Sequence, residues 1–233
     1  MKIRSVKAIE VNVTPHATTK PRVPKIETDG FVSPMQRYPE LKRSDWANSW
    51  KRTACVVTAE DGTWGFGLTL HSGVTVPLIN DHIGPMIEGE NCMATERVWD
   101  LMQKATAPYG TAGVSSFAIS AVDNALWDLK GKLLNKPVYE IIGGPQKEKI
   151  FCYASNTDLS YPTDDSIDWF LELGFKAVKL FLREGPDAGL PGLNRTEELV
   201  AKTREQVGPD VEIAVDCWMS MNTDYMVRLA EQL

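Results

Sequence analysis

The stretch Glu212-Ile213-Ala214-Val215-Asp216-Cys217-Trp218 decides the predicted fold. Its residues 213–215 form an apolar run with two β-branched members, and Asp216 follows this run directly. A buried strand of a parallel sheet has this form when it delivers a carboxylate to the carboxyl end of the sheet. We therefore expect a buried strand here that ends in a functional carboxylate.

A charged residue also lies inside the preceding strand pattern. The segment 176–181 reads Lys-Ala-Val-Lys-Leu-Phe, so Lys179 has apolar neighbours on both sides. A buried charge requires a counter-ion, a metal or a substrate. Two interpretations remain open. Lys179 and Asp216 form an ion pair in the core, or both contribute to an active site at the carboxyl ends of neighbouring parallel strands.

Strand and helix patterns alternate from residue 150 onward. The strands are expected at 150–154, 177–182 and 211–215, and the helices at 164–173, 196–207 and 223–233. Repeats of roughly 30 to 40 residues with this alternation are typical of parallel βα units with right-handed crossovers. We therefore predict a parallel sheet in this part of the chain.

The first part of the chain has the pattern of an α+β domain. A strand is predicted at 3–13, and Asp61-Gly62 is the turn dipeptide of a hairpin with strands at 53–59 and 63–70. Gly65 and Gly67 in the second hairpin strand indicate a bulge or the close approach of another backbone. Apolar periodicity predicts helices at 76–87, 94–104 and 115–134.

Several polar and helix-breaking residues of this part receive structural interpretations. His71 ends the hairpin and is interpreted as structural rather than catalytic. Asp123 and Asp128 lie in the segment 115–134 and are interpreted as part of a solvated helix edge. Gly84-Pro85 is expected to break the helix at 76–87, because proline cannot donate the backbone hydrogen bond of a helix interior.

The segment 15–50 is predicted to be a long loop, because five prolines interrupt it. Loops of this length usually either bind something or are disordered, and the aromatic residues of this one argue against disorder. We expect a lid or binding loop that sets substrate specificity. Arg43 and Tyr38 are the expected substrate contacts, since arginine is suited to bidentate recognition of oxygen atoms.

Composition argues against several classes of function. The 233 residues carry a net charge of −6 without a basic stripe, so no nucleic-acid partner is expected. No apolar stretch approaches about 18 residues, which argues against a membrane span and a membrane partner. The four cysteines lack zinc-like spacing and three lie in apolar segments, so we expect reduced cysteines in a cytoplasmic protein.

Several strings of residues resemble the mandelate racemase and muconate lactonizing enzyme branch of the enolase superfamily. Residues 121–128, Ala-Val-Asp-Asn-Ala-Leu-Trp-Asp, resemble the long helix that precedes the barrel in that branch. Residues 137–139 and 142–144 resemble the start of its barrel. Residues 34–40 and 216–220 resemble the L-rhamnonate dehydratase group of sugar-acid dehydratases.

The resemblance implies a fold and an activity. An α+β capping domain over 1–147 would be followed, over 148–233, by the first three βα units of a (β/α)8 TIM-type barrel, which would be incomplete. The implied reaction is Mg²⁺-dependent dehydration of a rhamnonate-like sugar acid, by abstraction of the proton α to the carboxylate and loss of the β-hydroxyl. A homo-oligomer is implied for the full-length enzyme.

The resemblance also assigns site residues. Asp216 matches the first of three acidic metal ligands, and Lys179 matches the first lysine of the second-strand motif. Phe181 stands where many members carry a second lysine, which agrees with the rhamnonate dehydratase pattern, where the base is a His-Asp pair on later strands. The remaining ligands and the base would lie beyond Leu233, so this chain alone is expected to be inactive.

Three strands of a barrel are expected to leave apolar side chains unpacked. Because side chains alternate across a strand, one set or the other of these residues would face the missing core: Phe151, Tyr153, Val178, Leu180, Ile213 and Val215. The chain is therefore expected to aggregate, to be molten in its second half, or to depend on a partner. Two alternatives to a sugar-acid dehydratase stay open: another enolase-superfamily enzyme, such as a cycloisomerase or a racemase, and a non-catalytic chain that needs a partner.

Overall fold

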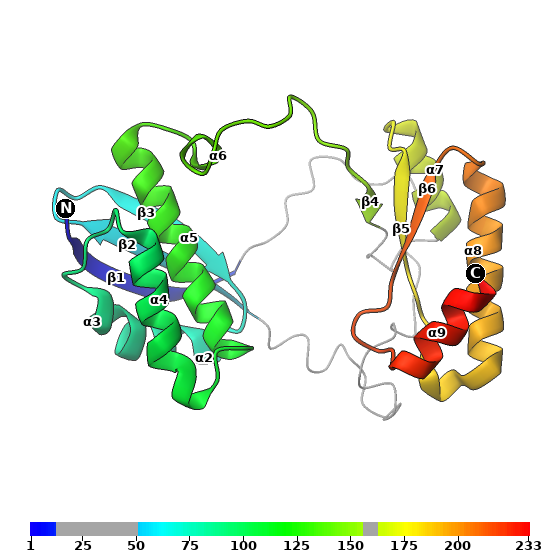
Figure 1. Cartoon of the computed structure of the whole chain (residues 1–233), viewed down its shortest axis with the longest axis horizontal. Helices are drawn as coiled ribbons and strands as arrows, with labels where there is room; N and C mark the ends of the chain where they lie inside the picture. The colour runs from blue at the N-terminus through cyan, green and yellow to red at the C-terminus, as the bar shows by residue number, and fades with distance from the viewer. Residues whose placement is uncertain (13–50, 156–162) are drawn as a thin grey trace. The chain divides into compact units, whose positions relative to one another are not determined.

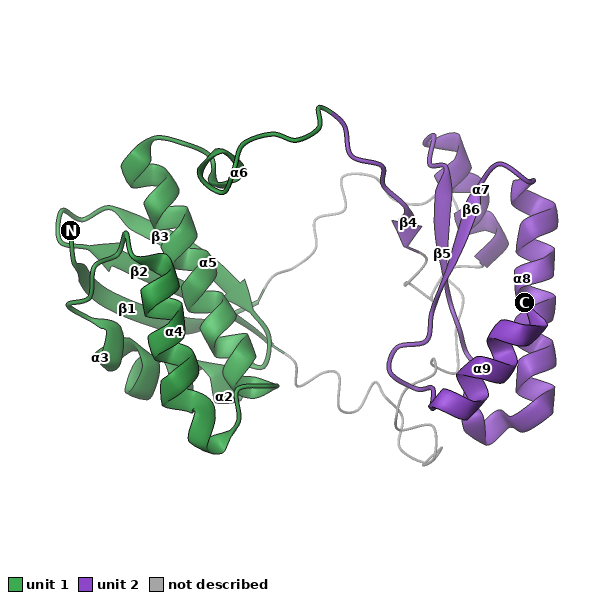
Figure 2. Ribbon diagram, viewed as in Figure 1, with its two compact units in different colours: residues 1–15, 48–148 green, residues 16–47, 149–233 purple. Residues whose placement is uncertain are grey.

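The computed structural model describes residues 1–12, 51–155 and 163–233 (Figure 1). The described residues divide into two compact units, with the boundary in sequence after Glu148 (Figure 2). The predicted loop 15–50, which includes Tyr38 and Arg43, lies outside the described residues. Within the described ranges, no helix is both long and apolar enough to cross a bilayer.

The first unit contains an antiparallel sheet of three strands in the order β1-β2-β3. These strands are β1 (Ile3–Val11), β2 (Arg52–Ala59) and β3 (Trp64–Thr69). The predicted hairpin is confirmed, with Val57 opposite Gly65 in the register of β2 and β3. Residues of β1 that face the core, Ile3, Val6 and Ala8, are buried, so the sheet has one face toward the helices of its own unit.

A continuous helical segment follows β3. It consists of α2 (Ser72–Pro77), the π-helix η2 (Leu78–Ile83) and α3 (Gly84–Ile87). The prediction that Gly84-Pro85 breaks this helix is wrong. The π-helical turn ends with the Gly84 N–H donating to Ile79 O, and Pro85 then falls in the first turn of α3, where proline is best tolerated.

The helix α5 (Val114–Leu134) forms the other layer of the first unit. It packs so closely on β3 that a Cβ added at Gly65 would lie 2.0 Å from Ala125 O, and one at Gly67 would lie 2.0 Å from Ala121 O. The predicted close approach of a backbone is therefore confirmed. The remaining helices of this unit are α4 (Thr95–Thr106), η3 (Ala107–Tyr109) and α6 (Val138–Ile141).

The second unit contains a parallel sheet in the order β4-β5-β6, as predicted. Its strands are β4 (Ala154–Ser155), β5 (Ala177–Phe181) and β6 (Glu212–Asp216), and its helices are α7 (Thr163–Glu172), η4 (Pro186–Ala188), α8 (Gly189–Val207) and α9 (Thr223–Gln232). Two boundaries were wrong: residues 150–153 are not strand, and the helix predicted at 196–207 begins at Gly189.

One face of the parallel sheet is packed. Val178 and Leu180 of β5 are fully buried, and Leu182, Leu193, Tyr225 and Leu229 form a small core against which Val215 packs. Because side chains alternate across a strand, only one set was expected to face the missing core, and Val178 and Leu180 belong to the other, buried set. Phe151 and Tyr153, by contrast, are 64% and 53% exposed.

Candidate active site

Lys179 and Asp216 lie on the face of the parallel sheet opposite to Val178 and Leu180. Alternation along β5 places Lys179 there, and its register partner on β6 is Ala214. Asp216 lies two residues further along β6, on the same face, at the carboxyl end of the strand. The long lysine side chain spans this offset, so two neighbouring strands bring a cation and an anion together.

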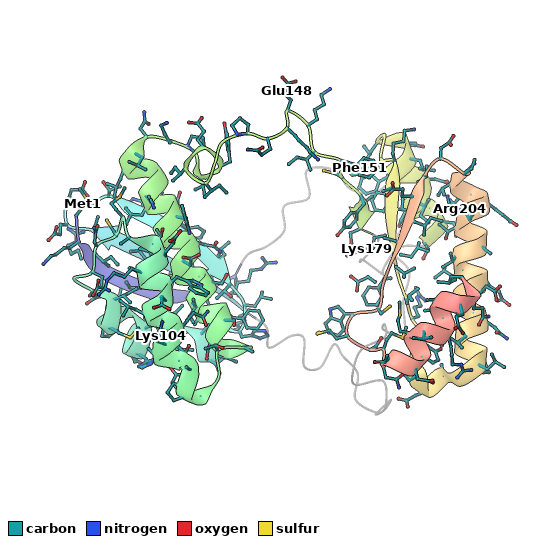
Figure 3. All side chains as sticks on the ribbon, viewed as in Figure 1. Met1, Lys104, Glu148, Phe151, Lys179 and Arg204 are labelled. Carbon is teal, nitrogen blue, oxygen red and sulfur yellow. The ribbon has the colours of Figure 1, made fainter. Side chains whose placement is uncertain are left out.

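The two charged groups form an ion pair. Lys179 Nζ lies 3.0 Å from Asp216 Oδ2, and the two side chains are 21% and 29% exposed. The predicted contact between Lys179 and Asp216 is therefore confirmed. The ion pair is also compatible with an active site, because both side chains keep some access to solvent. Figure 3 shows the side chains of this unit, with Lys179 labelled on β5.

The pair keeps both groups charged. The Lys179 ammonium, and then the backbone N–H of Trp218, hold the pKa of Asp216 below its ordinary value. The Asp216 carboxylate in turn raises the pKa of Lys179 above its ordinary value. At neutral pH, Lys179 is therefore a cation and not a base, and its chemical capacity is to bind or stabilise negative charge.

The loop that follows β6 orients the carboxylate. Asp216 Oδ1 accepts a hydrogen bond from Trp218 N at 2.9 Å, while Oδ2 faces Lys179. Trp218 and Met219 have φ values of 40° and 61°, a left-handed conformation that residues other than glycine seldom adopt. Such strained residues often lie beside functional groups, and here two of them lie two and three residues after the carboxylate.

Tyr153 is a third member of this cluster, and the sequence analysis assigned it no functional role. Its ring centroid lies 5.3 Å from Lys179 Nζ, within the range of a cation–π contact. Tyr153 lies two residues before Ser155, the register partner of Lys179 on β4. Residues two apart on an extended segment lie on the same face, and Ser155 pairs with Lys179. This alternation is the sequence signal that could have placed Tyr153 beside Lys179.

The described residues supply one carboxylate toward a metal site. Carboxylate oxygen is what Mg²⁺ prefers, so Asp216 is chemically suited as a ligand. A magnesium site needs more than one such group, and within residues 1–12, 51–155 and 163–233 no three His, Cys, Asp or Glu side chains lie close enough to hold a metal ion. These residues therefore do not form a complete site.

The polar residues of the first unit have structural contacts. The ring of His71 lies 4.7 Å from that of Phe117, and His71 has a φ of 60° at the start of α2. Asp128 accepts hydrogen bonds from Phe66 N and Lys132 Nζ, so its interpretation as a merely solvated edge is wrong. Asp123 is half-buried, which raises the pKa of its carboxyl group.

The predicted cysteine environments are only partly correct. Cys55 and Cys92 are buried, and burial raises the pKa of the Cys55 thiol to about 12. Cys217 is half-buried, with its Sγ 3.9 Å from Met226 Sδ. Cys152, however, is exposed, because the residues before β4 do not continue the strand. All four thiols are free.

Comparison with known proteins gives consistent matches over the chain. Residues 48–143 match the N-terminal domain of the mandelate racemase / muconate lactonizing enzyme family. An L-rhamnonate dehydratase of Saccharopolyspora erythraea is 40% identical over 205 residues, which are 87% of this chain and 50% of that protein. The chain thus spans about half the length of this curated relative.

Solved structures give the same result. The crystal structure of L-rhamnonate dehydratase from Gibberella zeae matches 99% of this chain and 55% of its own, with a TM-score of 0.81 and 30% identity. The same enzyme complexed with Mg matches with a TM-score of 0.82 and 29% identity, over 99% of this chain and 56% of its own. Taken together, these matches show that the chain belongs to the mandelate racemase and muconate lactonizing enzyme branch of the enolase superfamily and is similar to L-rhamnonate dehydratases.

Proposed function

We propose that the enzyme containing this chain catalyses the Mg²⁺-dependent dehydration of a sugar acid, L-rhamnonate or an acid of similar structure. The reaction removes the proton α to the carboxylate and expels the β-hydroxyl as water, and the resulting enol becomes a 2-keto-3-deoxy acid. The observation that carries this proposal is the Lys179–Asp216 pair at the carboxyl end of a parallel sheet, in a chain 40% identical to an L-rhamnonate dehydratase.

Lys179 acts in this proposal as a fixed cation. Abstraction of an α-proton places negative charge on the substrate carboxylate, and that charge must be stabilised for the weakly acidic proton to leave. The Lys179 ammonium projects from the strand face that carries Asp216, so a carboxylate bound beside Asp216 lies within its reach. Lys179 therefore binds the substrate carboxylate or stabilises the developing enediolate.

Asp216 acts as one oxygen ligand of the metal. Its carboxylate is already oriented by Trp218 N, so it does not have to be ordered when the ion arrives. Bound Mg²⁺ would supply Lewis-acid stabilisation of the enediolate. Lys179 is an ammonium and Phe181 is apolar, so neither is suited to take the α-proton, and we expect the base to come from another part of the enzyme.

The three βα units are proposed to belong to a (β/α)8 barrel. Their parallel order, and the packing of Val178 and Leu180 on the helix side, agree with a barrel wall whose opposite face is the interior. In that arrangement Lys179 and Asp216 would face the interior at its carboxyl end, where the active sites of such barrels lie. The proposal also leaves Arg43 and Tyr38 as candidate substrate contacts from the loop 15–50.

The test is turnover of a panel of sugar acids by the enzyme that contains this chain, with Mg²⁺ present. We expect keto-acid formation from L-rhamnonate or a stereoisomer, and a loss of about 10²- to 10³-fold in kcat for Lys179→Met. Lys176→Met is the matched control, because Lys176 is exposed and precedes β5. Racemisation or cycloisomerisation without water loss, or unchanged turnover by Lys179→Met, would contradict the proposal.

A further inference from the structure

Among the described residues, Lys179 contacts one partner on the neighbouring strand β6 and one in the segment just before β4. Asp216 Oδ2 on β6 lies 3.0 Å from Nζ, and the ring of Tyr153, just before β4, has its centroid 5.3 Å from the same atom. The ammonium of β5 is thus contacted by groups carried by the segments on both sides of its strand. The ion pair is the stronger contact, and the aromatic ring is the one for which the proposed chemistry gives no role.

A lysine side chain needs more than one contact to be held in place. Its ammonium is a point charge on a flexible stem of four carbons, so one counter-ion fixes the distance to that ion but leaves rotation about the stem. A ring that approaches within about 6 Å attracts the cation through its negative face and removes part of this freedom. An aromatic ring acts through its quadrupole, so this contact restrains the ammonium without neutralising it.

The position of Tyr153 is set by the backbone. Ser155 pairs with Lys179 in the parallel register of β4 and β5, and Tyr153 lies two residues earlier in the same chain segment. Tyr153 remains 53% exposed, although a tyrosine buries apolar area readily. An exposed aromatic ring beside the one cation of this strand favours a role at the site over a role in the core.

We propose that Tyr153 is a positioning residue, whose ring holds the Lys179 ammonium beside Asp216 on the functional face of the parallel sheet. This inference rests on the proposed function, because that function makes Lys179 the cation of the site. The Tyr153 hydroxyl also offers a hydrogen bond to Lys179, and the inference predicts that the aromatic ring restrains the ammonium even without this hydroxyl. Tyr153→Phe and Tyr153→Leu separate these two features.

The experiment is NMR of the enzyme that contains this chain, with ¹³C-labelled lysine, in which Lys179→Met identifies the Lys179 signal. The ring should shift the ε-methylene signal of Lys179 upfield of exposed lysines. We expect Tyr153→Phe to keep this displacement and Tyr153→Leu to lose it. Phe151→Leu is the matched control, since Phe151 lies two residues earlier in the same segment and is 64% exposed.

The proposal would be overturned if the upfield shift of the Lys179 ε-methylene signal remained in Tyr153→Leu. It would also be overturned if this shift were lost in Tyr153→Phe, because the contact would then belong to the hydroxyl. Should Tyr153→Leu fail to fold, nuclear Overhauser contacts between the Tyr153 ring and the Lys179 ε-methylene of the wild-type enzyme decide the same question, and their absence overturns it. None of these measurements requires turnover, so the inference and the proposed function can fail separately.

Turnover adds a second readout in the enzyme that contains this chain. Tyr153→Leu should lower kcat by about two- to fivefold, the range of a solvent-accessible cation–π contact, with KM little changed. Tyr153→Phe should restore the wild-type value. If Tyr153 had only a structural role, wild type and Tyr153→Leu would have the same kcat per folded enzyme. That result would contradict the proposal.

Discussion

The two units differ in what they bury. In the first unit, helix α5 lies against β3 with backbone contact at Gly65 and Gly67. The large core of this unit contains fully buried residues such as Leu126 and Leu129. Among the described residues of the second unit, the core that includes α8 and α9 contains four buried side chains: Leu182, Leu193, Tyr225 and Leu229. The opposite face of its sheet carries an ion pair beside the buried Ala177 and Phe181.

This difference separates stability from function. The first unit fills the face of its sheet with apolar side chains, and its ion pairs are well exposed, as in Lys104–Asp100 with 74% and 55%. The second unit uses a face of its sheet for Lys179 and Asp216, which are 21% and 29% exposed. Charges at such positions add little to folding, so their placement is better explained by chemistry.

The largest expected effect comes from the two cores. Leu126→Ala should destabilise the first unit by about 2–5 kcal/mol, because a fully buried leucine leaves a cavity in a densely packed core. Leu229→Ala should cost less and act on the second unit, since α9 buries only Tyr225 and Leu229 and can open locally. Hydrogen exchange resolved by peptide measures both. Equal losses for the two variants would contradict the difference between the cores.

A smaller effect is expected at the contact of helix and sheet in the first unit. Gly67→Ala should cost toward the upper end of about 1–3 kcal/mol, because its Cβ would lie 2.0 Å from Ala121 O and the backbone must move. Gly73→Ala is the control, since it lies in α2 with no atom within 4 Å of an added Cβ, and alanine favours the helix. Denaturant unfolding compares the two; a Gly67 variant as stable as the Gly73 variant would refute the close packing.

Asp128 tests a polar contact of the same unit. Asp128→Ala removes the acceptor of Phe66 N on the edge strand β3 and the partner of Lys132, and should cost about 1 kcal/mol. Asp100→Ala removes only the exposed pair with Lys104 and should cost less than about 0.5 kcal/mol. If thermal unfolding of both variants is the same, the hydrogen bond to β3 contributes nothing.

The ion pair of the second unit should give the smallest effect on stability, with a defined pH dependence. The pKa of Asp216 is lowered, so its contribution is present above the unfolded pKa and is lost as pH falls through the folded value. The pKa of Lys179 is raised, so its contribution is present below the unfolded pKa and is lost as pH rises through the folded value.

The difference in unfolding free energy between wild type and Asp216→Asn should therefore be greatest at neutral pH. We expect it to be no more than about 1 kcal/mol there and to close in strong acid and strong alkali. Urea titrations of metal-free protein over a pH series give this difference. A constant difference across the whole range would mean that the pair does not control it.

The sequence predicted the parts of the fold that repeat a pattern. The hairpin, α5 and the parallel sheet follow from alternation, apolar periodicity and the spacing of βα units. The boundaries that failed depend on non-local packing: β4 is short because the residues before it do not pair, and the helix through Pro85 continues because a π-helical turn accommodates it. Neither feature leaves a periodic signal.

The candidate site was predictable to the extent that it lies on strands. Lys179 and Asp216 each interrupt or end an apolar run, and the parallel register brings them together. Tyr153 was missed because it was interpreted only as an apolar side chain of the strand predicted at 150–154, although it lies two residues from Ser155, the register partner of Lys179. Arg43 and Tyr38 lie outside the described residues, so their role stays a prediction.

The most direct test of the central claim, that Asp216 holds the metal of a sugar-acid dehydratase, is Mg²⁺ binding by calorimetry in the enzyme that contains this chain. Substitution of a residue that only orients a metal ligand costs about 10- to 100-fold in metal affinity. Asp216→Asn removes a proposed direct ligand, so it should weaken Mg²⁺ binding by more than this, and turnover should fall as well. The control Asp210→Asn changes an exposed carboxylate just before β6 and should leave the affinity unchanged. Equal Mg²⁺ affinity in the two variants would contradict the account.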